Sequence, residues 1–169
     1  MATQKLKFDI EQDDRPIMLF FQDEGRFGRI SNLSRCWVPP KTRAIVGKQQ
    51  IREYVYAYSA VCPHTGENYS LIMPYANSES MNFFVDELSK EYPKYRIILT
   101  MDNACWHSSK NMVLPENIRF WHIPPYSPEL NPAEHLWDYI RETKKFNNQT
   151  FNSIEDVVEK LSQALNEMK

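Results

Sequence analysis

The stretch PPYSPELNPAEHLW, from Pro124 to Trp137, carries the strongest fold signal in this chain of 169 residues. Its four prolines restrict the backbone, so the approach to the following helix is stiff. Asn131 is a favourable N-cap, Pro132 suits the first helical position, and Glu134 falls at the third. In the simplest interpretation, Glu134 closes a capping box onto Asn131. Alternatively, a carboxylate at the end of a rigid approach can share a metal ion, and the rest of the chain decides between the two.

Two short apolar runs bear on this choice. Residues 17–21 (IMLFF) are followed by Asp23, and residues 97–101 (IILTM) by Asp102. Such runs, bounded by polar residues, predict strands that are buried on both faces. Apolar residues at helical spacing over 78–92 predict a crossover helix, which makes the two strands parallel. Parallel strands end at one edge of a sheet, so we expect Asp23 and Asp102 to converge there, although either acid alone is often only a turn former.

Three sequence blocks together resemble the DDE transposases, and most closely the bacterial insertion-sequence branch of the mariner-type superfamily. The blocks are Gln22-Asp23-Glu24, then Met101-Asp102-Asn103-Ala104 with His107, and Tyr126 to Trp137. The third block is the most specific and the first is the weakest. The resemblance covers roughly residues 15–145. It implies an α/β, RNase H-like fold with a mixed five-stranded sheet flanked by helices, and metal-dependent DNA cleavage and strand transfer.

The resemblance also implies roles for individual residues. Asp23, Asp102 and Glu134 match the catalytic triad, which would hold two Mg²⁺ or Mn²⁺ ions. Contacts to these carboxylates or to DNA are expected from nearby polar residues, namely Asn103, His107 and His135. Two other acids were weighed: strand alternation turns Glu24 away from the face of Asp23, and Glu129 is the fallback if Glu134 is only a cap.

Two features depart from the family pattern. The 31 residues between Asp102 and Glu134 are slightly fewer than is usual in the superfamily. Only about fifteen residues precede the first expected strand, where these transposases normally carry helix-turn-helix modules. We therefore expect residues 1–14 to be a lead-in and 15–169 a single catalytic domain. An upstream helix-turn-helix domain, or a separate reading-frame product, would be its partner, unless the chain is a truncated copy.

Composition and cysteine usage agree with a single domain. With 42% hydrophobic and 25% charged residues, the chain has an ordinary globular composition. Its polar start does not resemble a signal peptide, and no apolar stretch suits a membrane span. Three widely spaced cysteines indicate reduced thiols, which favours the bacterial cytoplasm, with association to the nucleoid when DNA is bound. A zinc site built from Cys62-x-His64 and Cys105-x-His107 is disfavoured because neither pair has the usual two-residue loop.

The net charge of −2 is unusual for a DNA-binding protein, so the distribution of charge matters more. Between Gly25 and Arg52 there are seven basic residues and no acid, which predicts a positive surface for phosphates. These residues are Arg26, Arg29, Arg35, Lys41, Arg43, Lys48 and Arg52. Trp37 and two prolines suggest a structured, hairpin-like excursion, while an ordinary solvated loop remains the alternative. The expected partner is double-stranded DNA, as transposon ends and target, bound by a homodimer.

The remaining pattern completes an α/β order. Strands are expected at 53–61, 69–73 and 118–123, the second following a turn at His64-Thr65-Gly66-Glu67. Helices are expected over 132–145 and 153–168, and the apolar stripe of the last helix suits core packing or, alternatively, a partner helix. The function indicated is that of a transposase catalytic domain. The alternatives are another RNase H-like nuclease, such as a junction resolvase, and a non-catalytic regulatory or remnant fragment.

Overall fold

The computed structural model describes residues 13–102, 113–125, 127–144 and 146–168, which form one sheet and three α-helices. The strands are β1 (Ile17–Ile30), β2 (Gln50–Val61), β3 (Asn68–Met73), β4 (Arg96–Met101) and β5 (Ile118–His122). The helices are α1 (Ser78–Glu91), α2 (Ala133–Thr143) and α3 (Ile154–Asn166), and a short 3₁₀ helix, η1 (Pro128–Leu130), precedes α2. The mixed five-stranded sheet flanked by helices that the sequence predicts is therefore confirmed.

The sheet has the strand order β3-β2-β1-β4-β5. β1, β4 and β5 run parallel, whereas β2 and β3 add antiparallel neighbours to β1. The crossover through α1 makes β1 and β4 parallel, as expected from the helical pattern over 78–92. Their register pairs Ile17 with Arg96 and ends at Phe21 with Thr100. The carboxyl edge of the parallel part therefore begins just after these two residues.

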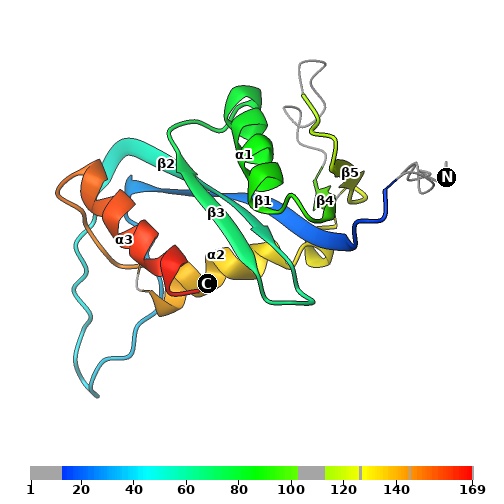
Figure 1. Cartoon of the computed structure of the whole chain (residues 1–169). Coiled ribbons are helices and arrows are strands. Elements are labelled where there is room, and N and C mark those ends of the chain that lie inside the picture. Colours follow the sequence, from blue (N-terminus) through cyan, green and yellow to red (C-terminus); the bar gives the residue numbers. More distant parts are fainter. Residues whose placement is uncertain (1–12, 103–112, 126, 145, 169) are drawn as a thin grey trace.

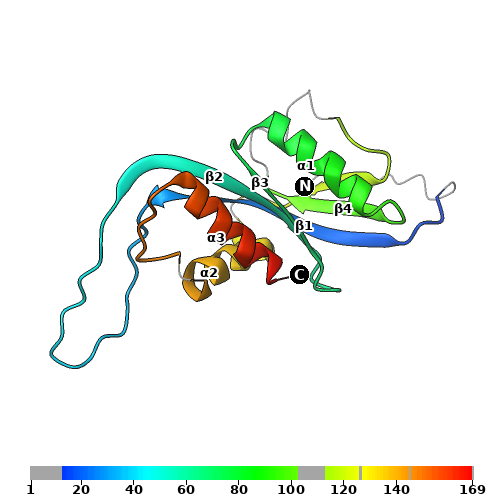
Figure 2. The same cartoon turned by 60° about the vertical axis from the view of Figure 1, so that its left-hand side comes forward.

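Helices cover the two faces of the sheet separately. α1 lies on one face, while α2 and α3 lie on the other (Figures 1 and 2). Two clusters of buried side chains follow from this sandwich. The first joins α1 to the sheet through Phe20, Tyr58, Phe84 and Leu99 among others. The second joins α2 and α3 to the far ends of β1 and β2 through Phe27, Trp137, Ile140, Phe151 and Leu161 among others.

Helix starts follow the sequence signals closely. Ser153 and Asp156 form a reciprocal capping box at the start of α3, within the helix expected over 153–168. α2 begins at Ala133, one residue later than expected, but the Asn131 side chain still caps it by accepting the Ala133 N–H at 3.1 Å. Among the described residues, no helix has the length and apolar character needed to cross a bilayer.

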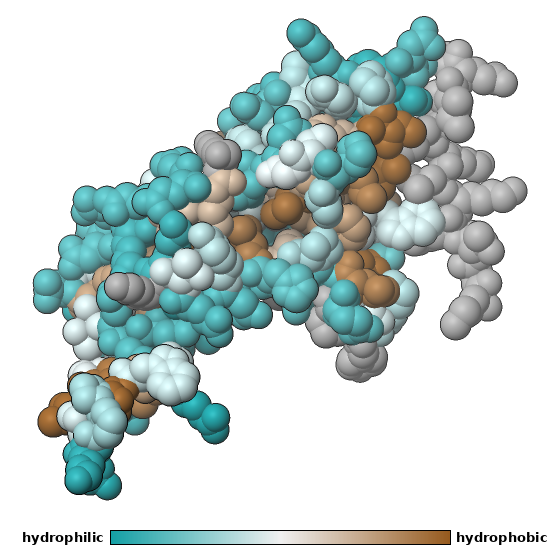
Figure 3. All heavy atoms as spheres, turned by 90° about the horizontal axis from the view of Figure 1, so that it is seen from below, coloured by the Kyte–Doolittle hydropathy of each residue, from teal (hydrophilic) through white to brown (hydrophobic). Residues whose placement is uncertain are grey.

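Residues 31–49, which connect β1 to β2, form a long arm that projects from the body of the protein (Figures 1 and 2). A hairpin-like excursion is expected between Gly25 and Arg52. Only its base is a β-hairpin, formed by the end of β1 and the start of β2, because the arm itself contains no strand. The Asn148 side chain fixes the base, accepting the Ser34 N–H at 2.9 Å and donating to the Ser34 O at 3.0 Å. Apolar side chains gather on the arm (lower left in Figure 3), and Trp37 and Ile45 are almost fully exposed.

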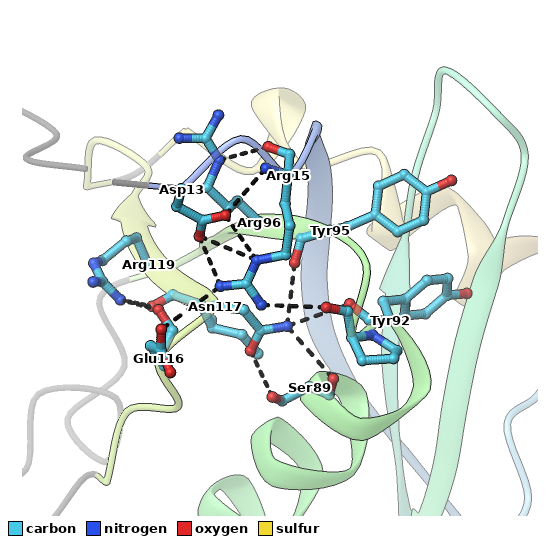
Figure 4. Close-up of polar contacts among 11 residues, drawn as sticks. Asp13, Arg15, Ser89, Tyr92, Tyr95, Arg96, Glu116, Asn117 and Arg119 are labelled. Carbon is cyan, nitrogen blue, oxygen red and sulfur yellow. Dashed lines mark hydrogen bonds and ion pairs between the residues drawn. The ribbon is translucent and has the colours of Figure 1, made fainter. Parts of the chain in front are cut away.

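A polar network ties together the amino ends of β4 and β5 (Figure 4). The buried Asn117 side chain accepts the Ser89 hydroxyl at 2.6 Å, and its amide donates to the carbonyl O atoms of Ser89, Tyr92 and Tyr95 at 3.2–3.5 Å. This single side chain therefore links the end of α1 to the two strands that follow it. Asn117 is 4% exposed, so its side chain makes these bonds from a buried position.

A second part of the same network anchors the start of β1. The Arg15 guanidinium donates to both carboxylate oxygens of Asp13 at 2.7–3.1 Å and to the Pro93 O at 3.2 Å. Arg96 Nε donates to the Arg15 O at 2.7 Å. Arg15 lowers the pKa of Asp13 to about 2, chiefly by hydrogen bonding. Asp13 and Arg15 therefore form an ion pair at this end of the sheet.

Candidate active site at the carboxyl edge of the sheet

Asp23 lies inside β1 and not just past its end as expected, because β1 continues along β2 as far as Ile30. It is nevertheless two residues beyond Phe21, the last β1 residue paired with β4. Strand alternation places Asp23 on the same face as Gly25 and Phe27, which contact α2. Glu24 takes the opposite face, as predicted. Asp23 is therefore at the carboxyl edge of the parallel part, facing α2.

Asp102 follows β4 directly, as the sequence predicts. Two residues on from the Phe21–Thr100 pair, the two strands reach Asp23 and Asp102, so the register brings these acids to the same level of the sheet. The Asp102 side chain is exposed, and His122 Nδ1 lies 3.3 Å from its carbonyl O. Asn103 and His107, which the resemblance places beside the site, lie outside the described residues.

Glu134 is in the first turn of α2, where its carboxylate is exposed. Within the described chain no hydrogen bond joins this carboxylate to the Asn131 N–H, so the capping-box interpretation of Glu134 does not hold. Asn131 instead caps the helix alone. Glu134 lies close enough to Asp23 for its charge to raise the pKa of that acid. His135, the next residue, is also exposed, and Glu129 lies in η1 before the helix.

Trp137 holds the Asp23 carboxylate, a role that the sequence interpretation missed. Its Nε1–H donates to Asp23 Oδ2 at 2.8 Å, from a side chain that is 3% exposed. A Cβ atom at Gly25 would lie 2.7 Å from the indole ring, so only glycine at that position allows the ring to lie this close to β1. Two facts could have identified this contact. Buried tryptophan N–H groups usually find an acceptor, and Trp137 shares a helix face with Glu134.

The pKa of Asp23 is raised from 3.8 to about 6. Burial is the main cause, because desolvation disfavours the ionised form. Hydrogen bonds from Trp137 and from the Glu24 backbone lower the pKa, while the charges of Glu24 and Glu134 raise it further. Burial therefore raises this pKa more than repulsion from the neighbouring acids does.

The three acids supply only carboxylate oxygens, the donors that Mg²⁺ and Mn²⁺ prefer. Asp23 has one oxygen bound by Trp137, and Glu134 is exposed at the edge, so their chemistry fits such ions. Across the described ranges, however, no three His, Cys, Asp or Glu side chains lie close enough together to hold a metal ion. Without a bound cation, three carboxylates repel one another and are not expected to lie in close contact. For the alternative zinc site, the structure describes only one of the two pairs. In that pair Cys62 is buried and His64 is exposed, while Cys105 and His107 lie outside the described residues.

A polar groove of about 570 Å³ runs along β1 beyond Glu24. Arg26 lines it, with its guanidinium 4.8 Å from the centre of the Tyr54 ring, and so does Arg141 of α2, which the sequence interpretation did not consider. Arg29 is tied to the body of the protein instead, because it donates to Glu53 at 2.7 Å and to the Phe151 O at 3.1 Å. The other predicted DNA contacts are exposed, on the arm or beside it on β2: Arg35, Lys41, Arg43, Lys48 and Arg52.

A mixed sheet of this order with acids at its carboxyl edge defines an RNase H-like domain, and solved structures share the fold. The chain is similar to the Mos1 transposase in a paired-end complex with the left transposon end, with a TM-score of 0.66 and 19% identity. That match covers 88% of this chain and 48% of the Mos1 chain. The catalytic core domain of BIV integrase is also similar, with a TM-score of 0.50, 16% identity, and 88% and 80% of the two chains covered.

The family follows from sequence. The model of the DDE superfamily endonuclease family matches residues 18–166, so the chain belongs to that family. An uncharacterized protein of Sinorhizobium fredii, y4pE/y4sA, is 32% identical over 116 residues, which cover 68% of this chain and 85% of that protein. The chain spans about half the length of the Mos1 chains that it matches. The predicted resemblance to transposases with an RNase H-like fold is therefore confirmed.

Proposed function

We propose that this chain is the catalytic domain of a mariner-type insertion-sequence transposase, which cleaves DNA at the ends of its element and joins the freed ends to a new site. One observation carries the proposal: β1, β4 and α2 bring Asp23, Asp102 and Glu134 to a single edge of the sheet. Membership in the DDE endonuclease family and the likeness to Mos1 support it. Solved Mos1 paired-end complexes include forms with Mn and with Mg.

Asp23, Asp102 and Glu134 would hold two divalent ions. When bound, such ions stabilise the attacking and leaving oxygens of a phosphodiester in an in-line displacement. The protein contributes a fixed carboxylate at Asp23, which Trp137 binds through one oxygen. The exposed acids at Asp102 and Glu134 are open to the solvent side, from which a DNA backbone can approach.

Cleavage of DNA carrying the ends of the element tests the proposal. D23N, D102N and E134Q should each lower the divalent-dependent rate by on the order of a thousandfold, because several kcal/mol of charge stabilisation is lost and each 1.4 kcal/mol is a factor of ten. E129Q is the matched control and should keep full activity. If E129Q loses activity while E134Q keeps it, the third acid is misassigned.

Product analysis separates the alternatives. Joining of a freed 3′ end to a second duplex supports a transposase, whereas branched-DNA cleavage without joining would indicate a resolvase-type nuclease. No divalent-dependent cleavage of any DNA, by the chain alone or with an upstream DNA-binding partner, would favour a non-catalytic fragment.

The exposed basic residues of the arm are proposed to contact DNA phosphates. Neutralising Lys41 and Arg43 to Gln should weaken binding to all sequences alike and reduce the salt slope by up to about 2, since each lost phosphate contact removes about 0.9 from that slope. The matched control neutralises Lys90 and Lys94, which lie at the end of α1 and just beyond it. An unchanged salt slope in the Lys41/Arg43 variant would favour the alternative interpretation, in which the arm is an ordinary solvated loop.

We further propose that the active form is a homodimer on double-stranded DNA, in the bacterial cytoplasm, and that end recognition needs an upstream helix-turn-helix region or a separate product that carries one. The isolated chain should then bind DNA weakly and without sequence preference, with a Kd on the order of 10⁻⁴ to 10⁻⁶ M. Competition between a terminal-repeat duplex and a scrambled duplex of equal length decides this. A clear preference for the repeat would contradict the split arrangement.

A further inference from the structure

Two polar contacts join β1 to α2 and the residues just before it, one at the carbonyl O of Gln22 and one at the Asp23 carboxylate, and both come from buried side chains. Asn131, just before the helix, is 5% exposed, and Trp137, one turn into it, is 3% exposed. Neither residue lies on the surface where DNA could reach it. Their hydrogen bonds therefore serve the arrangement of the site and not direct recognition of a substrate.

Asn131 ties together the backbone next to two of the acids. Its Nδ2–H donates to the carbonyl O of Gln22 at 3.0 Å, and its Oδ1 accepts the N–H of Ala133 at 3.1 Å. Gln22 directly precedes Asp23, and Ala133 directly precedes Glu134. Capping α2 requires only the acceptor, so the bond to Gln22 goes beyond what a helix cap needs. It holds β1 just past Phe21, where pairing with β4 has ended.

Trp137 fixes the carboxylate itself. Its Nε1–H binds Asp23 Oδ2 at 2.8 Å, while its ring lies against Gly25 and edge-on to Phe27, with ring centroids 5.9 Å apart. Packing on both sides restricts the indole, so the direction of its N–H is set by the core. A phenyl ring could fill much of this space, but only a side chain with a donor can orient the carboxylate.

We propose that Asn131 and Trp137 are positioning residues that together fix the Asp23 carboxylate relative to Glu134, so that both acids can ligate the same divalent cations. This inference rests on the proposed function, because it assumes that Asp23 and Glu134 are metal ligands. Partners that orient the ligands of a metal affect its affinity without touching it, typically by 10- to 100-fold.

The test measures Mn²⁺ binding to the whole chain, by the electron paramagnetic resonance signal of free Mn²⁺, with no DNA present. N131S keeps the cap, since serine also accepts the Ala133 N–H, but its side chain is too short to reach Gln22. W137F keeps the aromatic packing and removes the donor. Matched controls make the same changes elsewhere: N77S at the cap of α1, where Asn77 accepts the Ser80 N–H, and W121F on β5.

N131S and W137F should each weaken Mn²⁺ binding by at least about tenfold, and the two controls should bind as the unmodified chain does. In DNA cleavage, both variants should lower kcat and leave the KM for DNA unchanged, because neither side chain reaches the surface. Urea denaturation verifies that each variant is folded, and N131S decides the matter if W137F is not.

Comparison with D23N separates the two hypotheses. If D23N loses Mn²⁺ binding while N131S and W137F keep it, the positioning role is wrong and the proposed function stands. If D23N also binds Mn²⁺ like the unmodified chain, Asp23 is not a ligand, and both the proposed function and the inference fall.

Discussion

Two aspartates near opposite ends of the parallel part of the sheet have opposite pKa shifts. Arg15 lowers the pKa of Asp13 to about 2, whereas burial raises the pKa of Asp23 to about 6. Around Asp13 and Asn117, the amino end pairs Asp13 with Arg15 and gives the buried Asn117 amide three acceptors (Figure 4). The carboxyl edge instead keeps one acid half-buried and two exposed. Perturbed acids of this kind gather where proteins bind ions or perform chemistry, so the contrast agrees with the proposed site at the carboxyl edge.

Removal of Asn117 should have the largest effect on stability. In N117A the carbonyl groups of Ser89, Tyr92 and Tyr95 lose a shared donor, and the Ser89 hydroxyl loses its acceptor. A net hydrogen bond contributes about 1 kcal/mol and an unsatisfied buried group costs about 1–3 kcal/mol, so we expect a loss of about 2–4 kcal/mol in the free energy of unfolding. Urea denaturation measures it, and N152A, at an exposed position, should stay within about 0.5 kcal/mol. A loss below 1 kcal/mol in N117A would mean that this end of the sheet is not the stabilising one.

The half-buried acid at the other end, Asp23, should have the opposite effect: its side chain destabilises the fold when it is ionised. In the metal-free protein the pKa of Asp23 is about 6 when folded and about 3.8 when unfolded, so the unfolded state binds fewer protons between these values and stability falls as pH rises. D23N should remove this loss. Its advantage over the unmodified chain should be absent below about pH 4, grow to about pH 6, and level off near 2–3 kcal/mol.

The measurement is urea denaturation in EDTA across this range of pH. D138N, at an exposed acid on α2, serves as the control and should show no such trend. An advantage of D23N that is the same at pH 4 and pH 7 would contradict the raised pKa. Mg²⁺ should reduce the advantage, because a cation favours the ionised Asp23 in the unmodified chain.

Much of this contrast could be predicted from sequence, but the contacts that create it could not. The parallel crossover predicts that Asp23 and Asp102 share an edge, and the resemblance to the DDE transposases adds Glu134 to them. The polar run Gln22-Asp23-Glu24 looks like the end of a strand, yet β2 pairs with β1 through to Ile30 and keeps it extended. That pairing is long-range and leaves no local signal. Helical spacing likewise indicates that Trp137 is buried, but not which group its N–H meets.

Gln22 is the sharpest case of this limit, because a glutamine beside two acids is expected at the surface. It is 1% exposed, and in the described part of the chain neither its Nε2 nor its Oε1 has a hydrogen-bond partner. Replacing an unsatisfied buried amide by an apolar group of similar shape is expected to stabilise, so Q22M should gain about 1 kcal/mol. Thermal or urea denaturation measures the gain. A loss of stability in Q22M would show that the amide is bound in solution, for instance by ordered water.

The smallest effect is expected from the paired acid at the amino end, and it should run opposite to that of Asp23. The pKa of Asp13 is lowered from 3.8 to about 2, so its ion pair with Arg15 stabilises the fold above about pH 4 and loses that effect as the pH falls through 2. The pair is solvent-accessible, and such pairs contribute little. D13N should therefore shift the denaturation midpoint less than N117A, D23N or Q22M does. The difference should be present at pH 7 and vanish by about pH 2, and D14N, at the exposed neighbouring acid, should not reproduce it. If D13N destabilises as strongly at pH 2 as at pH 7, the hydrogen bonds and not the charge of Asp13 hold Arg15, and the electrostatic contrast between the two ends would rest on Asp23 alone.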